Sequence, residues 1–155
     1  MSHRIGVVGL SHLRSAARYG WLRGALDRHL PARPGGLRLA LWGLAYKKNT
    51  RSTKNSAALR LIAALSDRGT LVVYDPEATL PAPPAHVEIA PTAEAAVGGA
   101  DGLVILTDWD EFAACDPAAV RALLRAPVVV DAVDVLDPDR ARAAGLTYVA
   151  MGEAA

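Results

Sequence analysis

The segment RLALWGLAYKKNTRSTKNS (residues 38–56) joins an apolar run to a long polar connection. Residues 38–44 are almost entirely apolar, which is typical of a strand buried on both faces. Residues 55–67 follow with apolar side chains at helical spacing, and Gly69 stands just past them, where glycine often ends a helix. A buried strand, a polar loop and a helix form the first unit of an α/β fold.

The rest of the chain repeats this alternation. Strand patterns lie at residues 71–74, 87–90, 102–107, 127–131 and 146–150, and helical patterns lie at residues 93–97, 117–124 and 138–144. Several strands are unbroken apolar runs, which indicates a parallel sheet with both faces covered. We therefore predict a Rossmann-like, doubly wound α/β fold with a mainly parallel sheet of about five to six strands and helices on both faces. Ligands of such sheets bind beyond the carboxyl ends of the strands, so the loops that follow the strands are the expected site.

The first 35 residues have a different character. Residues 15–30 have helical spacing, and PARPGG (residues 31–36) is a linker pattern. We expect an N-terminal part, residues 1–35, made of a short strand, a helix and a linker, followed by one domain over residues 36–155. The apolar run at residues 5–10 is too short for a signal peptide or a membrane span, so we expect a cytoplasmic chain.

Composition excludes several classes of protein. The charges nearly balance, with 17 basic and 16 acidic residues in 155, so neither nucleic acid nor an anionic membrane is an expected partner. The single cysteine, Cys115, excludes a disulfide framework. The neighbouring Asp116 would raise its pKa, which favours a structural thiol over a reactive one. The four histidines are scattered without the spacing of metal ligands, so no metal site is expected.

The polar loop after the first strand carries a cluster of cations, Lys47, Lys48, Arg51 and Lys54. A cationic loop that leads into a helix amino terminus can bind an anion such as phosphate, because free backbone N–H groups add to the side-chain charge. The alternative is a solvated basic loop in which Asn55 or Ser56 only caps the helix. The residues alone leave both interpretations open.

Several ordered motifs resemble the C-terminal, UDP-binding domain of the UDP-glucose/GDP-mannose dehydrogenase family. They are GLAYKKNT and STKNS in residues 43–56, LIAALSDRG at 61–69, VVYDP at 72–76, ADGLVILTDWDEF at 100–112, VVVDAVDVLD at 128–137 and GLTY at 145–148. The resemblance covers roughly residues 36 to 151, by the span of these motifs.

The resemblance implies a set of site residues. Tyr46 and Lys47 match an aromatic–lysine pair that contacts the bound UDP-sugar, and Lys48 is a further candidate for substrate binding. Lys54 matches a position, usually arginine, near the nicotinamide cofactor. The implied partner is a UDP-sugar or nucleoside diphosphate. In the intact family enzyme the reaction is NAD-dependent oxidation of a sugar alcohol for polysaccharide synthesis.

Other segments depart from the family pattern. The turn after the fifth strand, residues 131–134, reads DAVD where the family commonly has an arginine that reaches the nucleotide sugar. Residues 4–14 resemble the first strand and turn of the NAD-binding domain, but Ser11 and Arg14 replace two of its glycines. Asp75 ends the second strand, where an acid either binds a ribose or starts an Asp-Pro turn.

Two functions follow as hypotheses. The first is a nucleotide-sugar-binding domain of an NAD-dependent 6-dehydrogenase, inactive alone because the chain lacks the catalytic cysteine motif and an intact NAD site; no catalytic residue and no cofactor are expected in this chain by itself. Whether the chain is an enzyme is left open. The alternative is a non-catalytic association module that forms a homodimer, with Trp21 and Trp109 as exposed anchors.

Overall fold

The computed structural model describes residues 2–152, with side chains described from residue 16 onward. Its centre is one six-stranded sheet in the order β3-β2-β1-β4-β5-β6, and every neighbouring pair of strands is parallel. The strands are β1 (Leu37–Trp42), β2 (Gly69–Tyr74), β3 (Val87–Ile89), β4 (Gly102–Ile105), β5 (Val128–Asp131) and β6 (Thr147–Ala150). The predicted doubly wound parallel sheet is confirmed.

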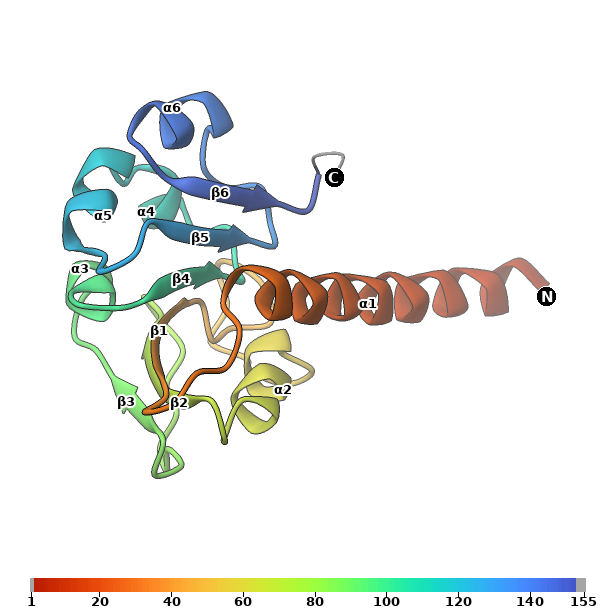
Figure 1. The fold of residues 1–155 in the computed structure, drawn as a ribbon. Coiled ribbons are helices and arrows are strands. Elements are labelled where there is room, and N and C mark those ends of the chain that lie inside the picture. The colour runs from red at the N-terminus through yellow and green to blue at the C-terminus, as the bar shows by residue number, and fades with distance from the viewer. Residues whose placement is uncertain (1, 153–155) are drawn as a thin grey trace.

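Helices cover both faces of the sheet (Figure 1). They are α1 (Ser2–His29), α2 (Ala57–Ala64), α3 (Ala93–Val97), α4 (Asp110–Ala113), α5 (Pro117–Leu123) and α6 (Pro138–Ala143). Side chains cap the starts of four of them, since Ser56, Thr92, Asp116 and Asp137 each accept a hydrogen bond from a backbone N–H of the first turn. With four residues, α4 is too short to show a helical period in the sequence.

The core on one side of the sheet is built on an aromatic pair. The rings of Trp42, at the end of β1, and Phe112, in α4, stack with centroids 4.9 Å apart, and Tyr74 meets the same Phe112 ring edge-on. The Trp42 indole N–H donates to the Ala93 carbonyl at 3.1 Å, so the buried ring has no unsatisfied donor. This pair ties the end of β1 to α3 and α4, next to the edge where the strands terminate.

The N-terminal part differs from its prediction. The short strand expected within residues 4–14 is wrong, because the backbone from Ser2 to His29 is one helix. Its later half packs on the sheet through Leu22 and Leu26, whereas its earlier half projects beyond the carboxyl ends of the strands (Figure 1). No sheet edge lies beside the projecting part to satisfy a strand's backbone groups, and a helix satisfies them internally. In residues 2–152, no helix combines the length and apolar character that crossing a bilayer requires.

The switch point of the sheet lies between β1 and β4. From β1 the chain moves to β2 on one side, and it later returns to place β4 on the other side. Gly43, just after β1, has φ +111°, and a Cβ at this position would overlap the Thr107 hydroxyl that follows β4. Only glycine allows this close approach of the two strand ends.

Candidate functional site

The carboxyl ends of β1, β4 and β5 surround an open hollow of about 290 Å³, which we call the strand-end hollow. It is the place where ligands bind in doubly wound sheets. Its lining comes from α1 and from the three loops that follow these strands: Arg18, Tyr46, Lys47, Leu106, Thr107, Asp108, Ala132, Val133 and Asp134.

The loop between β1 and α2 is fixed at its start by the Asp75 carboxylate. Its Oδ2 accepts hydrogen bonds from the backbone N–H groups of Leu44 at 2.8 Å and Ala45 at 2.9 Å, and from the Trp109 indole at 3.3 Å. The Ser56 hydroxyl donates to the Leu44 carbonyl at 2.7 Å. Three residues far apart in the sequence, Ser56, Asp75 and Trp109, thus determine where the side chains after Ala45 leave the core.

Two of the three predicted substrate-binding residues line the strand-end hollow. Tyr46 is the most exposed aromatic side chain among those described, at 55%, and its backbone N–H closes the loop on the Ser52 carbonyl at 2.7 Å. Lys47 is exposed and has no ion-pair partner among the described residues. Lys48 does not line the hollow, since its ammonium lies 3.7 Å from Asp110 at the start of α4.

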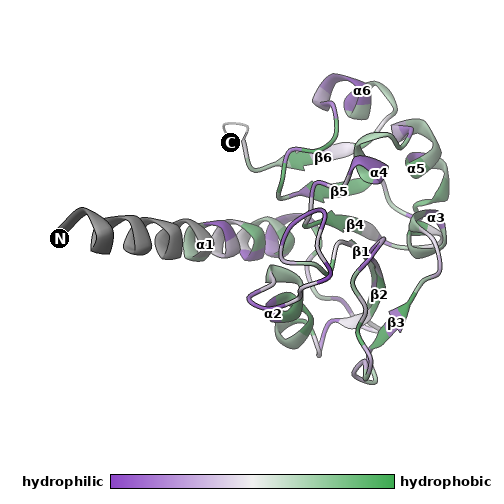
Figure 2. Cartoon of the chain, turned by 180° about the vertical axis from the view of Figure 1, so that it is seen from behind, coloured by the Kyte–Doolittle hydropathy of each residue, from purple (hydrophilic) through white to green (hydrophobic). Residues whose placement is uncertain are grey.

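The other cations of this loop point elsewhere. Arg51 pairs with Glu77 at 3.4 Å. Lys54 is exposed and lines neither the strand-end hollow nor the neighbouring pocket at the start of α2. Figure 2 shows this loop as largely hydrophilic beside green, hydrophobic strands. Lys47 is therefore the one lysine of the cluster that faces the hollow.

The turn after β5 is held by Asp131, whose side chain is fully buried. Its carboxylate accepts from the backbone N–H groups of Val133, Val135 and Leu136 and from the Tyr148 hydroxyl at 2.6 Å. Asp134 stands at the tip with φ +52°, lines the hollow and accepts from the Gly152 N–H at 3.1 Å. This wall of the hollow presents an exposed carboxylate.

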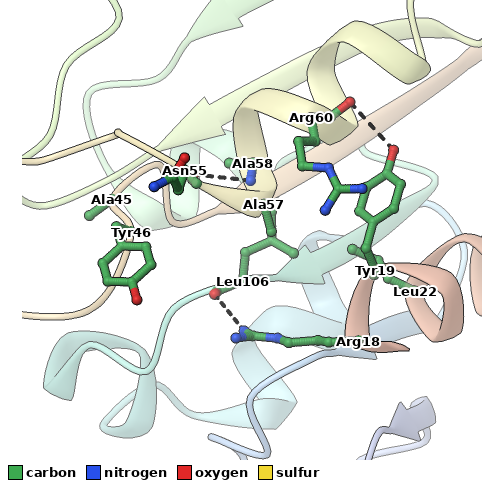
Figure 3. A pocket seen from close by; sticks show the side chains of 11 residues that line it. Arg18, Tyr19, Leu22, Ala45, Tyr46, Asn55, Ala57, Ala58, Arg60 and Leu106 are labelled. Carbon is green, nitrogen blue, oxygen red and sulfur yellow. Dashed lines mark hydrogen bonds between the residues drawn. The ribbon is translucent and has the colours of Figure 1, made fainter. Parts of the chain in front are cut away.

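Arg18 of α1 is a site residue that the sequence analysis missed. Its guanidinium Nη2 donates to the Leu106 carbonyl at 3.0 Å, across 88 positions of sequence. Arg18 and Tyr46 line both the strand-end hollow and the small pocket at the start of α2 (Figure 3). One signal could have found it, because Arg18 lies four residues before the buried Leu22 and so on the helix face that contacts the sheet.

The end of β2 does not offer the free carboxylate that would bind the ribose of a nicotinamide dinucleotide. The acid at the end of β2, Asp75, has both carboxylate oxygens engaged by its own chain, with Oδ1 accepting from the N–H groups of Glu77 and Ala78. It therefore organises the turn and the adjacent loop, as the Asp-Pro interpretation predicts, and offers no free oxygen pair to a ribose.

The prediction that Trp109 is an exposed anchor for association is wrong. Trp109 is 8% exposed, because it folds over Asp75 ahead of α4, and Trp21 is half-buried against the core. The indole instead helps to hold the loop after β1, since its N–H donates to the same Asp75 oxygen as the loop backbone. This removes one of the two side chains on which the association hypothesis depended.

Cys115 is half-buried at the end of α4, and burial, with a smaller effect of Asp116, raises the pKa of its thiol to about 11. At pH 8 we therefore expect iodoacetamide to alkylate the folded chain about a hundredfold more slowly than the urea-unfolded chain. Because the folded pKa lies above the unfolded value, ionisation favours unfolding, and stability should fall as the pH rises above about 9. Equal alkylation rates in the two states, measured by intact-mass analysis, would contradict this assignment.

The fold and the site define a doubly wound α/β domain that has an exposed aromatic ring beside its switch point, next to a lysine that has no ion-pair partner within the described part of the chain. The family model described as "UDP-glucose/GDP-mannose dehydrogenase family, UDP binding domain" matches residues 40–138. The chain belongs to this family, and the matched part is its UDP-binding domain.

Several known dehydrogenases resemble the chain in sequence or in structure. The chain is 32% identical over 135 residues to a UDP-glucose 6-dehydrogenase of Rhizobium meliloti, covering 83% of this chain and 31% of that protein. It is 43% identical over 88 residues to one of Haloferax volcanii, covering 52% of this chain and 20% of that protein. The solved UDP-D-ManNAc dehydrogenase of Pyrococcus horikoshii superimposes with a TM-score of 0.67 at 27% identity, over 89% of this chain and 30% of that one. The chain thus spans less than a third of the length of these relatives.

Proposed function

We propose that the strand-end hollow binds a UDP-sugar or a nucleoside diphosphate, with Lys47 on a phosphate and Tyr46 packed against the uridine or the sugar. The observation that carries the proposal is the exposed Tyr46 ring next to a lysine without an ion-pair partner among the described residues, at the carboxyl edge of a parallel sheet. A lysine ammonium that is not paired with a carboxylate is available to bind a phosphate. An exposed aromatic ring buries apolar surface when it packs on a ligand. Lys48 supports the site from its position beside Asp110.

We further propose that this domain serves, together with NAD-binding and catalytic domains, in the oxidation of a sugar C6 hydroxyl by NAD in the cytoplasm. Lys54 would then face the cofactor side of the domain. Within this chain, Cys115 does not supply the reaction's nucleophile, since its raised pKa keeps the thiol protonated. The contribution of the described residues is to bind and orient the nucleotide.

Calorimetric titration of the 155-residue chain with UDP, UDP-glucose and GDP-mannose at low salt tests the proposal. We expect saturable binding of the uridine ligands and a roughly tenfold loss of affinity in Lys47→Ala, because one charge-assisted contact to phosphate is removed. Arg51→Ala is the matched control, since it removes a cation of the same loop that points away from the hollow, and should change the affinity by about twofold or less. Absence of UDP binding at millimolar concentration, or equal losses in both variants, would overturn the proposal.

A further inference from the structure

Among the residues that the structure describes, Arg18 forms no ion pair, although three carboxylates lie in its neighbourhood. Asp108, Asp131 and Asp134 all act on its charge, but no described carboxylate oxygen comes within 4.0 Å of its nitrogens. Asp131 is engaged by four other hydrogen bonds, three from the backbone of its own turn and one from the Tyr148 hydroxyl. Burial is the main influence on the guanidinium and lowers its pKa below the usual value.

The hydrogen bonds of Arg18 use only a small part of its donor capacity. A guanidinium carries five N–H groups, and among the described residues only one acceptor, the Leu106 carbonyl, meets them. Its Nε is buried and has no partner in the described structure. Such an arginine presents a fork of donors that matches the oxygens of a phosphate or carboxylate.

A second polar group without a partner lies in the same hollow. Thr107 is 2% exposed, lines the strand-end hollow, and its hydroxyl meets no hydrogen-bond partner among the described residues. Buried polar atoms in folded proteins are nearly always satisfied, so two unpartnered groups that line one hollow indicate a polar ligand there. Figure 3, which draws the neighbouring pocket at the start of α2, shows Arg18 reaching from α1 toward Leu106, with Tyr46 on the opposite side of that pocket.

We propose that Arg18 is a phosphate-binding residue of this site, so that α1 and the sheet together form the binding site for the diphosphate. The inference rests on the proposed function of the strand-end hollow and adds a residue and an element to it. Arg18 and Lys47 supply positive charge from two sides of the hollow. The carboxylates of Asp108 and Asp134 are available to accept hydrogen bonds from hydroxyl groups of the ligand. Without Arg18, the hollow would hold one lysine against two exposed carboxylates, a poor balance for a diphosphate.

The test compares UDP with uridine, which has no phosphate, by NMR titration of the full chain and its variants. We expect Arg18→Ala to weaken UDP binding roughly tenfold and to leave uridine binding unchanged. Arg18→Gln keeps an N–H donor for the Leu106 carbonyl but removes the charge, and it should lose UDP affinity to a similar extent. Arg28→Ala, which removes an exposed arginine farther along α1, should have little effect.

The outcomes separate this inference from the proposed function. If Arg18 only docked α1 on the sheet, Arg18→Ala would weaken UDP and uridine by the same factor, and Arg18→Gln would bind UDP normally; either result overturns the inference. The same holds if the wild type binds UDP, Lys47→Ala loses it and both Arg18 variants retain it. Failure of the wild-type chain to bind UDP would overturn the proposed function itself. If Arg18→Ala does not fold, Arg18→Gln decides.

Discussion

Replacing Asp131 by alanine is expected to lower the free energy of unfolding by about 4 kcal/mol, a large part of the stability of a domain of this size. The carboxylate is fully buried and accepts four hydrogen bonds, three from the backbone of the following turn and one from the Tyr148 hydroxyl. Alanine leaves these donors without a partner in a site closed to solvent, and each unsatisfied group costs about 1–3 kcal/mol. Urea unfolding followed by circular dichroism measures the loss.

Two further variants show whether the hydrogen bonds are responsible. Asp131→Asn can keep an oxygen at the Oδ2 position, which accepts from Val135, Leu136 and Tyr148, and lose only the bond to Val133. We therefore expect it to recover at least half of the loss. Asp134→Ala, three residues away and exposed, should change the stability by less than about 1 kcal/mol. A loss in Asp131→Ala no greater than in Asp134→Ala would contradict this account.

The sequence predicts the layers of this fold well, because each layer is encoded locally. Apolar runs such as residues 102–107 and 127–131 became the central strands β4 and β5. A strand buried on both faces needs apolar residues at every position, so composition over a few residues is sufficient. The loop cations were also predictable as a group, since a polar segment between a strand and a helix must lie at the edge of the sheet.

The arrangement of the site was not predictable, because it depends on contacts between distant residues. The helical spacing from Leu22 places Arg18 on the face of α1 that contacts the sheet, but it does not indicate that the partner of the guanidinium is the Leu106 carbonyl, 88 positions away. Trp109 lies between two aspartates, yet it is buried because its indole N–H finds Asp75. Lys47 faces the hollow and Lys48 does not, because the Lys48 ammonium lies beside Asp110. Asp110 belongs to α4, which is too short to give a periodic pattern in the sequence.

Asp75→Ala is expected to lower the free energy of unfolding by about 3 kcal/mol and also to weaken UDP binding. The carboxylate accepts five hydrogen bonds, from four backbone N–H groups and the Trp109 indole. Two of these donors, Leu44 and Ala45, directly precede Tyr46 and Lys47, so loss of the carboxylate releases the start of the binding loop. Urea unfolding and calorimetric titration of the same preparation measure the two effects.

The Asp75→Asn variant tests whether Asp75 organises the loop or is an acid that binds a ribose. Both carboxylate oxygens accept hydrogen bonds from N–H donors. Asparagine replaces one of these oxygens by an NH₂ group, which cannot accept a hydrogen bond, so the donors on that side lose their acceptor. We therefore expect Asp75→Asn to lose about 2 kcal/mol of stability, most of the alanine effect. A residue reserved for a ribose would give the opposite pattern, with unchanged stability in both variants and a loss confined to ligand binding. That pattern would show that Asp75 binds the ligand directly. Parallel losses of stability and UDP affinity would show that Asp75 holds Tyr46 and Lys47 at the edge of the sheet.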